Sequence, residues 1–320
     1  HRPAHQPHQK HQSRRRLRIL QCVVGGGFGG KEDVPSEYAA KAALLAYVLK
    51  KPVKLILDRA QDLMVSSKRH PMKMEYKVGV TKKGKMNALK VRVLADSGAY
   101  TTLSTVVLFR SSVHFGGPYV IPHVSGDIIG LYTNRVPCGA YRGFGTPQVI
   151  YAMESMINII CNDMGWDPFE FRKNNALKKG ASSITSHKIK ESCGLIETID
   201  KARKESEYDK RKKEFDKWNA DKSKRTLKGL GVSSIFYGMN LGAKGWFYDK
   251  AGSHIQICRD GSVTLCVGNV EMGQGAKTVL AQIASEALGC EISAINFTNV
   301  DTNIVPDSGP TVASRTTVMS

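Results

Sequence analysis

The chain has 320 residues, with 47 Lys or Arg against 28 Asp or Glu, so its formal net charge is +19. Its hydrophobic content of 41% excludes a disordered chain, and no apolar run reaches the roughly 18 residues of a membrane-spanning helix. The seven cysteines form no CxxC pair, which argues against a zinc ribbon or a disulfide scaffold and favours a cytoplasmic protein.

The chain begins with a basic segment. Residues 1–18 hold six Lys or Arg, no acidic residue and four of the nine histidines. This composition predicts a disordered basic leader that buries no core. A nucleic-acid-binding arm is the alternative interpretation of the same charges.

A first domain is predicted over residues 19–200. Apolar spacing and proline positions indicate a series of helices and strands. The expected elements are a strand at 17–24, a helix at 36–50, a short buried strand at 53–58, a hairpin of 73–81 and 86–96, a strand at 128–132, and helices at 147–162, 167–174 and 195–204.

A charged connection and a second domain follow. Residues 201–228 hold twelve Lys or Arg and six Asp or Glu, which predicts a solvated helical connection. The second domain, residues 229–320, should contain a hairpin of 254–258 and 262–267, a helix at 276–288 and a strand at 292–300. The mixture of hairpins and helices predicts an α+β fold. Because no clear finishing element precedes Ser320, the chain is interpreted as a fragment.

A glycine run follows the first predicted strand. Residues 25–30 (GGGFGG) fit the GxGxxG pattern of dinucleotide-binding folds, but a run so dense in glycine matches it easily. The acidic residue expected about 20 positions later is missing, because Asp58 lies well beyond that distance. Glu32 stands where a P-loop needs a hydroxyl. A tight turn that needs glycine only for its backbone is the remaining local interpretation.

Three further segments combine small residues with a polar side chain. They are residues 139–148 (GAYRGFGTPQ), 271–275 (EMGQG) and 305–314 (VPDSGPTVAS). Small residues leave backbone N–H groups accessible, and successive N–H groups form concavities that bind anions. Four such loops predict one bulky cofactor, multi-phosphate or pterin-like, held from several sides.

The four segments resemble, in order and spacing, the molybdenum-binding segments of the xanthine dehydrogenase/aldehyde oxidase family. The matching runs are 25–32 (GGGFGGKE), 140–145 (AYRGFG), 271–275 (EMGQG) and 308–314 (SGPTVAS). The resemblance covers about residues 17–320 and is nearest to the separate molybdenum subunits of bacterial xanthine dehydrogenases. It implies two mixed α/β-hairpin molybdopterin-binding domains.

The resemblance also implies a cofactor, molybdenum-molybdopterin, expected in a cytosine dinucleotide form. Phe28, Arg142 and Ala313 match positions whose main chain contacts the metal centre or its ligands. Gln274 matches a glutamine that contacts the pterin. The implied cofactor-binding residues are Gly27, Phe28, Gly29, Arg142, Gln274 and Ala313.

Three residues are implied at the substrate. Phe144 matches the aromatic residue that packs against the substrate ring, and Glu32 and Arg110 match the polar, catalytic positions of the purine-oxidising branch. Hydroxylation of a ring carbon with water-derived oxygen builds negative charge on the heterocycle. A fixed guanidinium at Arg110 would stabilise that charge, and the Glu32 carboxylate would hold a ring N–H.

The family pattern is incomplete in this sequence. The glutamate that acts as general base near the C-terminus of the family has no counterpart, and an earlier glutamine loop is replaced by the basic leader. Because no iron–sulfur cysteine cluster or flavin segment is present, [2Fe-2S] and FAD are expected on partner chains. The second aromatic residue at the substrate is left open among Phe236, Trp246 and Phe247. The chain alone is expected to be inactive.

The leading hypothesis is a molybdenum hydroxylase subunit that oxidises a purine such as hypoxanthine or xanthine in purine catabolism. Another oxidoreductase of the same family, acting on an aldehyde, nicotinate or an aromatic acyl-CoA, is the enzyme alternative. A basic nucleic-acid-binding protein built on residues 1–18 and 201–228 is the non-enzyme alternative. The mild charge of the remaining residues disfavours it.

Overall fold

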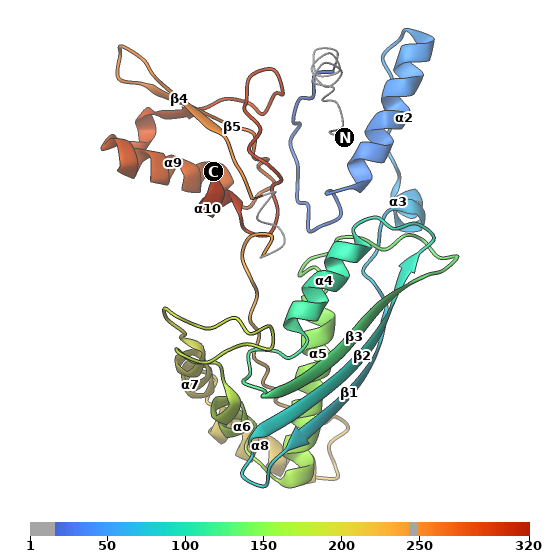
Figure 1. The fold of residues 1–320 in the computed structure, drawn as a ribbon, viewed down its shortest axis with the longest axis vertical. Coiled ribbons are helices and arrows are strands. Elements are labelled where there is room, and N and C mark those ends of the chain that lie inside the picture. Colours follow the sequence, from blue (N-terminus) through green and yellow to red (C-terminus); the bar gives the residue numbers. More distant parts are fainter. Residues whose placement is uncertain (1–16, 243–248) are drawn as a thin grey trace, which may run out of the picture. The chain divides into compact units, whose positions relative to one another are not determined.

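The computed structural model describes residues 17–242 and 249–320, which belong to two compact units (Figure 1). Unit 1 combines the chain up to Gly27 with Gly238–Ser320, and unit 2 is Phe28–Tyr237. Most of the predicted basic leader, together with Trp246 and Phe247, lies outside the described residues. That residues 19–200 and 229–320 each form an independent domain remains a prediction.

The core of unit 2 is a three-stranded sheet covered on one face by two helices. The strands β1 (Met72–Val80), β2 (Met86–Gly98) and β3 (His123–Tyr132) lie in the order β1-β2-β3. The first pair is antiparallel, as the predicted hairpin requires, and the second pair is parallel. Helices α4 (Ser104–His114) and α5 (Thr146–Met164) pack on the inner face (Figure 1).

Alternation along the strands explains which face of the sheet is covered. In β1 every second residue from Met72 is partly buried, while the residues between them are exposed. The inner residues of β2 meet Met153 and Ile157 of α5 in one apolar cluster. Side chains of a strand point to opposite faces in turn, so a period of two buries one face and leaves the other to solvent.

A buried ion pair anchors several segments of unit 2 to α5. The side chains of Arg172 and Glu154 are 0% and 5% exposed and approach to 2.8 Å. Arg172 also donates to Asn158 Oδ1 at 2.9 Å, and the Tyr119 hydroxyl donates to Glu154. The Ser234 backbone N–H donates to Glu154 Oε2 at 2.9 Å. A pair buried this fully is stable only when further hydrogen bonds satisfy both ions, as they do here.

The charged segment 201–228 forms two helices rather than one. Helix α7 (Leu195–Glu205) ends before Glu207, whose φ of 48° is left-handed, and α8 (Tyr208–Ala220) starts after it. Ile199 and Tyr208 pack with Phe169 of α6 (Pro168–Asn175) in a small apolar cluster. The segment is therefore attached to unit 2.

The N-terminal part of unit 2 contains α2 (Val34–Leu49) and α3 (Arg59–Val65). The helix predicted at 36–50 is confirmed; α3 was not predicted. The strand predicted at 53–58 is wrong for this structure, because residues 53–57 pair with no strand among the described residues. An extended segment becomes a strand only when a neighbour accepts its backbone hydrogen bonds.

Unit 1 contains a second small sheet with the order β4-β5-β6. The predicted hairpin is confirmed as β4 (Ser253–Ile257) and β5 (Val263–Val267), and the last predicted strand is short, β6 (Ile295–Phe297), after the 3-10 turn Ile292–Ala294. Helix α9 (Ala276–Leu288) packs its apolar face on this sheet, and a short α10 (Thr316–Met319) follows.

The N-terminal strand predicted at 17–24 is reduced to one bridge in unit 1. Leu20 pairs with Asp301, and the Gln21 backbone N–H donates to Val300 O at 2.9 Å. Arg18 forms an ion pair with the buried Asp301 carboxylate at 2.5 Å. Ile19 also exchanges hydrogen bonds with Thr302, so an ion pair and several hydrogen bonds hold the segment, and the run of glycines that follows weakens any longer strand.

We expect Arg172→Met to lower the free energy of unfolding of unit 2 by about 3–5 kcal/mol, because it leaves the Glu154 carboxylate buried without its partner. Chemical denaturation followed by circular dichroism measures this change. The matched control is Glu37→Gln, which removes an exposed ion pair with Lys41 and should cost at most about 1 kcal/mol. Equal losses in both variants would contradict the role assigned to the buried pair.

Candidate functional site

Two of the four predicted cofactor loops meet in unit 2. The Arg142 backbone N–H donates to the Phe28 carbonyl at 2.8 Å, and the Arg142 guanidinium lies 5.8 Å from the centre of the Phe28 ring. A Cβ at Gly29 would lie 2.8 Å from the backbone of Tyr141, so only glycine allows this approach. The structure therefore brings the loop at 28–32 against the loop at 140–145.

In unit 1 the loop at 305–314 is bonded to residues 268–270, which lead into the loop at 271–275. The Val270 backbone N–H donates to Thr311 Oγ1 at 2.9 Å, and the Gly268 N–H donates to Ser308 Oγ at 2.7 Å. A Cβ at Gly27 would lie 2.8 Å from the sulfur of Met272. The glycine run thus crosses from unit 1 to unit 2 between Gly27 and Phe28, and it contacts a second predicted loop within each unit.

Left-handed backbone marks three of the four loops at residues other than glycine. Phe28, Phe144 and Ala313 have φ values of 51°, 51° and 52°. Each such residue costs on the order of 1 kcal/mol or more, and residues of this kind concentrate at sites where a ligand must be approached. These three are all positions that the resemblance assigns to cofactor or substrate.

The loop at 271–275 is closed by its own side chains. Glu271 Oε1 accepts hydrogen bonds from the backbone N–H groups of Gly273 (2.7 Å) and Gly275 (3.1 Å). Burial by itself would raise the pKa of Glu271, but the backbone donors of the loop and of Lys277 outweigh it and lower the pKa. Gln274 accepts from Met272 N–H at 2.6 Å and donates to Val270 O at 2.9 Å. The predicted pterin ligand Gln274 thus shapes its loop.

Two arginines that sequence reasoning missed brace the loops. Arg315, with a fully buried side chain, bonds Asp249 Oδ1 at 2.9 Å and the carbonyl groups of Ser308 (2.9 Å) and Pro310 (3.0 Å). Arg69 donates to the Arg142 carbonyl at 2.7 Å and lies 4.3 Å from the Tyr141 ring centre. Neither belongs to a local motif, so no sequence signal distinguishes them from surface arginines.

The predicted substrate residues Arg110 and Glu32 both lie within electrostatic reach of Tyr237 in unit 2. The Arg110 guanidinium, on α4, lies 5.0 Å from the Tyr237 ring centre. Burial raises the pKa of the Tyr237 hydroxyl, and of the charges around it Arg110 lowers that pKa and Glu32 raises it. Tyr237 is therefore a further candidate site residue, and its sequence signal is its place beside Phe236.

An aromatic cluster supports this arrangement. The His114 ring stacks on Tyr237 with centres 5.6 Å apart and lies 5.0 Å from the Phe236 ring. Of the three aromatic candidates left open by the sequence, Phe236 is the one within the described residues, and it packs on His114. Burial lowers the pKa of His114, so the neutral imidazole is favoured beside Arg110.

The Glu32 carboxyl is easier to protonate than an ordinary glutamate. Although Glu32 is exposed, desolvation by nearby protein atoms and, second, the neighbouring Asp33 raise its pKa from 4.5 to about 7. Between these values the folded state holds more protons at Glu32 than the unfolded chain does. The stability that this proton uptake contributes is present below pH 4.5 and is lost as the pH rises through about 7.

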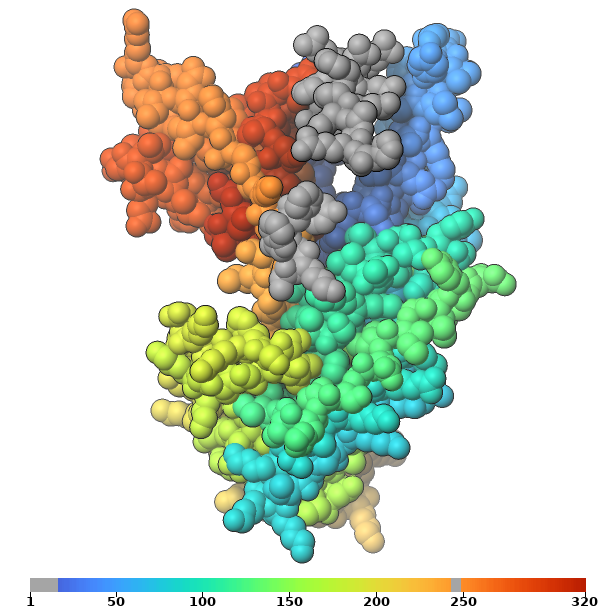
Figure 2. All heavy atoms as spheres, viewed as in Figure 1, coloured from blue at the N-terminus to red at the C-terminus, as the bar shows by residue number. Residues whose placement is uncertain are grey.

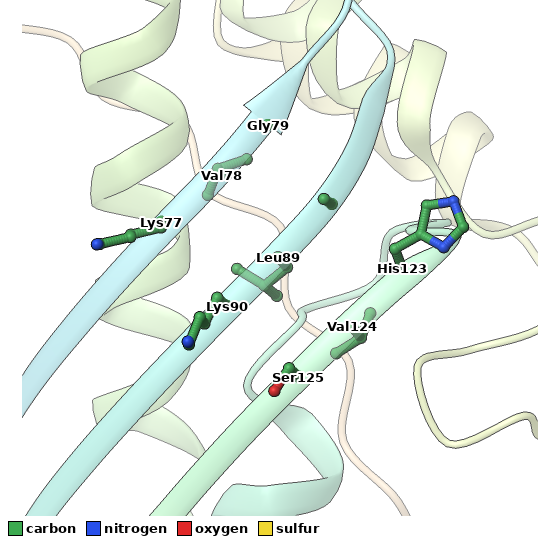
Figure 3. Close-up of a pocket in the computed structure, with 9 residues that line it drawn as sticks. Lys77, Val78, Gly79, Leu89, Lys90, His123, Val124 and Ser125 are labelled. Carbon is green, nitrogen blue, oxygen red and sulfur yellow. The ribbon is translucent and has the colours of Figure 1, made fainter.

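Two hollows of unit 2 lie away from these residues. One of about 440 Å³ lies on the sheet, where Lys77, Lys90 and Ser125 stand in a row across the three strands (Figure 3). Another of about 450 Å³ lies between α4 and β3. None of the predicted site residues lines either hollow, so the candidate site rests on the loop contacts and on the Arg110–Tyr237 cluster.

Comparison with known proteins identifies the family. Two models, each described as a molybdopterin cofactor-binding domain, match residues 11–176 and 201–320. The chain belongs to the molybdopterin cofactor-binding domain family. Its mixed α/β architecture agrees with this assignment, and the expected family and fold are confirmed. None of the helices in the described residues is long and apolar enough to cross a lipid bilayer.

Two enzyme subunits are among the proteins similar in sequence to this chain. The chain is 44% identical over 191 residues to the nicotinate dehydrogenase large molybdopterin subunit of Eubacterium barkeri. The aligned residues make up 60% of this chain and 44% of that protein. It is 34% identical over 304 residues to a probable xanthine dehydrogenase subunit of Bacillus subtilis, covering 95% of this chain and 39% of that protein.

A solved structure supports the same fold. The aldehyde oxidoreductase of Desulfovibrio gigas matches with a TM-score of 0.79 at 27% identity, over 95% of this chain and 33% of that one. The chain thus spans less than half the length of each of these three proteins.

The residues present fit a molybdopterin cofactor. The clash that any Cβ at Gly29 would meet keeps the backbone of its loop bare, and the left-handed residues Phe28 and Ala313 are retained despite their cost. Bare, strained backbone beside a guanidinium suits an anionic, phosphate-bearing group.

We expect Asp33→Asn to lower the midpoint at which Glu32 titrates, because it removes the like charge while the amide can still accept the Val34 N–H at the start of α2. The midpoint should stay above 4.5, since burial is the larger cause. Carboxyl-carbon NMR titration of Glu32 measures both values. A midpoint near 4.5 in the unsubstituted chain would contradict the environment described.

Proposed function

We propose that this chain is the molybdopterin-binding part of a cytoplasmic oxidoreductase that hydroxylates an N-heterocycle of the purine class. The observation that carries the proposal is that the buried Arg110 guanidinium lies 5.0 Å from the centre of the Tyr237 ring, which in turn stacks on His114. A guanidinium and a titratable carboxyl beside aromatic rings suit a flat, nitrogen-rich ring better than a simple aldehyde. The names of the Eubacterium barkeri and Bacillus subtilis relatives support the reaction class.

The proposed cofactor-binding residues are Gly27, Phe28, Gly29, Arg142, Gln274 and Ala313. When bound, molybdenum supplies a two-electron redox centre for oxygen transfer from water to the substrate. We propose a cytosine dinucleotide form of the pterin, with electrons leaving through [2Fe-2S] and FAD groups on partner chains.

The chain's own residues bind and polarise the substrate. Arg110 stabilises negative charge that builds on the ring during hydroxylation, and the stacked Tyr237 and His114 hold its guanidinium in one orientation. Glu32, with a pKa of about 7, is present near neutral pH in both protonation states. It can therefore donate to a ring nitrogen or accept from a ring N–H. Phe144 would pack against the ring.

A second substrate class is favoured by one specific finding. The relative with 44% identity is named as part of a nicotinate dehydrogenase. A buried arginine such as Arg110 can pair with the carboxylate of an N-heterocyclic acid. Comparing hypoxanthine, nicotinate and an aromatic aldehyde as electron donors to a dye, with the complete set of chains, separates the alternatives.

We expect the double variant Glu32→Val, Arg110→Met to lower kcat/KM for the purine by roughly 100-fold or more, because it removes both polar groups that hold the charged transition state. Turnover of an aldehyde should change much less. Steady-state dye reduction by the complete enzyme measures both. An equal loss with both substrates would overturn the assignment of these residues to a purine-type ring.

A further inference from the structure

Helix α4 carries Arg110 on the face that is turned into unit 2. Its buried residues recur at intervals of three or four, which is the spacing of one helical face. They are Ser104, Val107, Arg110, Ser111 and His114. Thr105 and Val106 lie outside this face and are exposed, and Figure 2 shows α4 at the surface of unit 2 in this view. Arg110 therefore shares its face with the residues that hold the helix in place.

The same face of α4 is in close contact with the end of the loop at 140–145. A Cβ added at Gly145 would lie 2.4 Å from Ser111 Oγ and 2.6 Å from the Val107 carbonyl oxygen, well inside a normal contact distance. Gly145 also has a left-handed φ of 89° and directly precedes α5. Only glycine satisfies both conditions. The residue that follows Phe144 therefore lies directly on α4.

The start of α4 is attached to the residue that precedes the same loop by two positions. Ser104 Oγ donates to the Cys138 carbonyl at 3.0 Å and lies 2.7 Å from His70 Nε2, and all three residues are buried. Thr102, just before α4, donates to the same carbonyl at 2.8 Å. Helix and loop are thus joined at both ends of the loop, so a shift of one displaces the other.

We propose that Ser111 is a positioning residue, whose small side chain sets how closely the Arg110 guanidinium approaches the Phe144 ring and therefore which rings fit between them. This inference rests on the proposed function, which assigns Arg110 and Phe144 to the substrate. Arg110 precedes Ser111 on α4, and Phe144 precedes Gly145 in the loop. The contact between the two small residues therefore fixes the relative position of their neighbours. Interiors packed this tightly respond to the addition of a single methyl group.

The size of Ser111 matters here, whereas its hydroxyl group is used within the helix. Ser111 Oγ donates to the Val107 carbonyl at 3.1 Å, a bond that reaches no substrate residue. Because a Gly145 Cβ would lie 2.4 Å from that Oγ, an added methyl group on this side would push helix and loop apart. Threonine keeps the hydroxyl and adds the methyl group, while alanine removes the hydroxyl and adds nothing. The two substitutions therefore separate size from hydrogen bonding.

The test compares Ser111→Thr with Ser111→Ala in the complete enzyme, by steady-state dye reduction with an aldehyde and with the N-heterocycle that the unsubstituted enzyme oxidises fastest. We expect Ser111→Thr to lower kcat/KM for the N-heterocycle roughly tenfold, mainly through kcat, because the displaced guanidinium no longer meets the charge of the transition state. Aldehyde turnover should change much less. Ser111→Ala should lose less N-heterocycle turnover than Ser111→Thr.

The matched control is Ser112→Thr, on the same helix. Its hydroxyl donates to the Phe109 carbonyl at 2.7 Å, and its side chain faces the hollow between α4 and β3. This variant should turn over both substrates like the unsubstituted enzyme. Molybdenum content and circular dichroism should match in all variants at the assay temperature, which separates positioning from loss of the cofactor or of the fold. A larger loss with alanine than with threonine, or an equal loss with both substrates, would overturn the proposal.

Nuclear magnetic resonance of the chain alone tests the contact without substrate or cofactor. The Val107 methyl protons should show a nuclear Overhauser effect to the Gly145 α-protons, because a Cβ at Gly145 would lie 3.0 Å from Val107 Cγ1. The effect should weaken in Ser111→Thr and persist in Ser112→Thr. Its absence from the unsubstituted chain would contradict the proposal whatever the variants do.

Failure of this proposal and failure of the proposed function give different results. If the enzyme oxidises N-heterocycles but Ser111→Thr and Ser112→Thr behave alike, the positioning role of Ser111 fails alone. If the enzyme oxidises aldehydes and no N-heterocycle, the proposed function fails, and the role of Ser111 fails with it.

Discussion

The organisation of this chain depends on backbone that side chains must not cover. Phe28, Phe144 and Ala313 hold left-handed conformations that a polypeptide ordinarily leaves to glycine. Such strain persists only when the surrounding structure enforces it. Here the enforcing contacts are specific: the Arg142 N–H holds the Phe28 carbonyl, and the buried Arg315 holds the carbonyls around Gly309. Loops fixed in this way can present main-chain groups to a large anionic ligand.

In unit 2 the buried core is connected to the candidate substrate residues. Glu154 and Arg172 form a buried ion pair, and one of the hydrogen bonds to Glu154 comes from the backbone of Ser234. Three residues later, Tyr237 stacks on His114 and lies over Arg110. The buried pair therefore also anchors the segment that brings Tyr237 to Arg110 and His114 on α4.

Sequence reasoning found the elements whose signals are local. The hairpin β1–β2 and the helices α2, α5 and α9 follow from alternation, helical spacing and proline or glycine at their ends. It missed α4, where serine and threonine dilute the apolar pattern, and it placed a strand at 53–58 that has no partner among the described residues. Strand formation is decided by a neighbour that the local sequence does not encode.

The candidate site also contains residues that the local sequence indicates and residues that it does not. Glycine-rich motifs indicated the four loops, because bare backbone leaves a compositional trace. Tyr237 and Arg69 could not be predicted, since each acts through a contact with a residue distant in the chain. Arg315 bonds nearby carbonyl groups, but its ion pair is with the distant Asp249. Whether Phe28, Arg142, Gln274 and Ala313 bind the cofactor stays a prediction, supported by the fit of the loops within each unit.

Whether bare backbone at residues 28–32 holds the cofactor is tested most directly by the molybdenum content of the complete enzyme carrying Gly29→Ala, compared with Gly180→Ala. Both glycines have a left-handed backbone, with φ values of 91° and 87°, but only a Cβ at Gly29 meets another part of the chain, at 2.8 Å. We expect Gly29→Ala to lose most of its molybdenum and Gly180→Ala to retain it. Full molybdenum content in the Gly29→Ala enzyme would contradict the claim that bare backbone at this loop holds the cofactor.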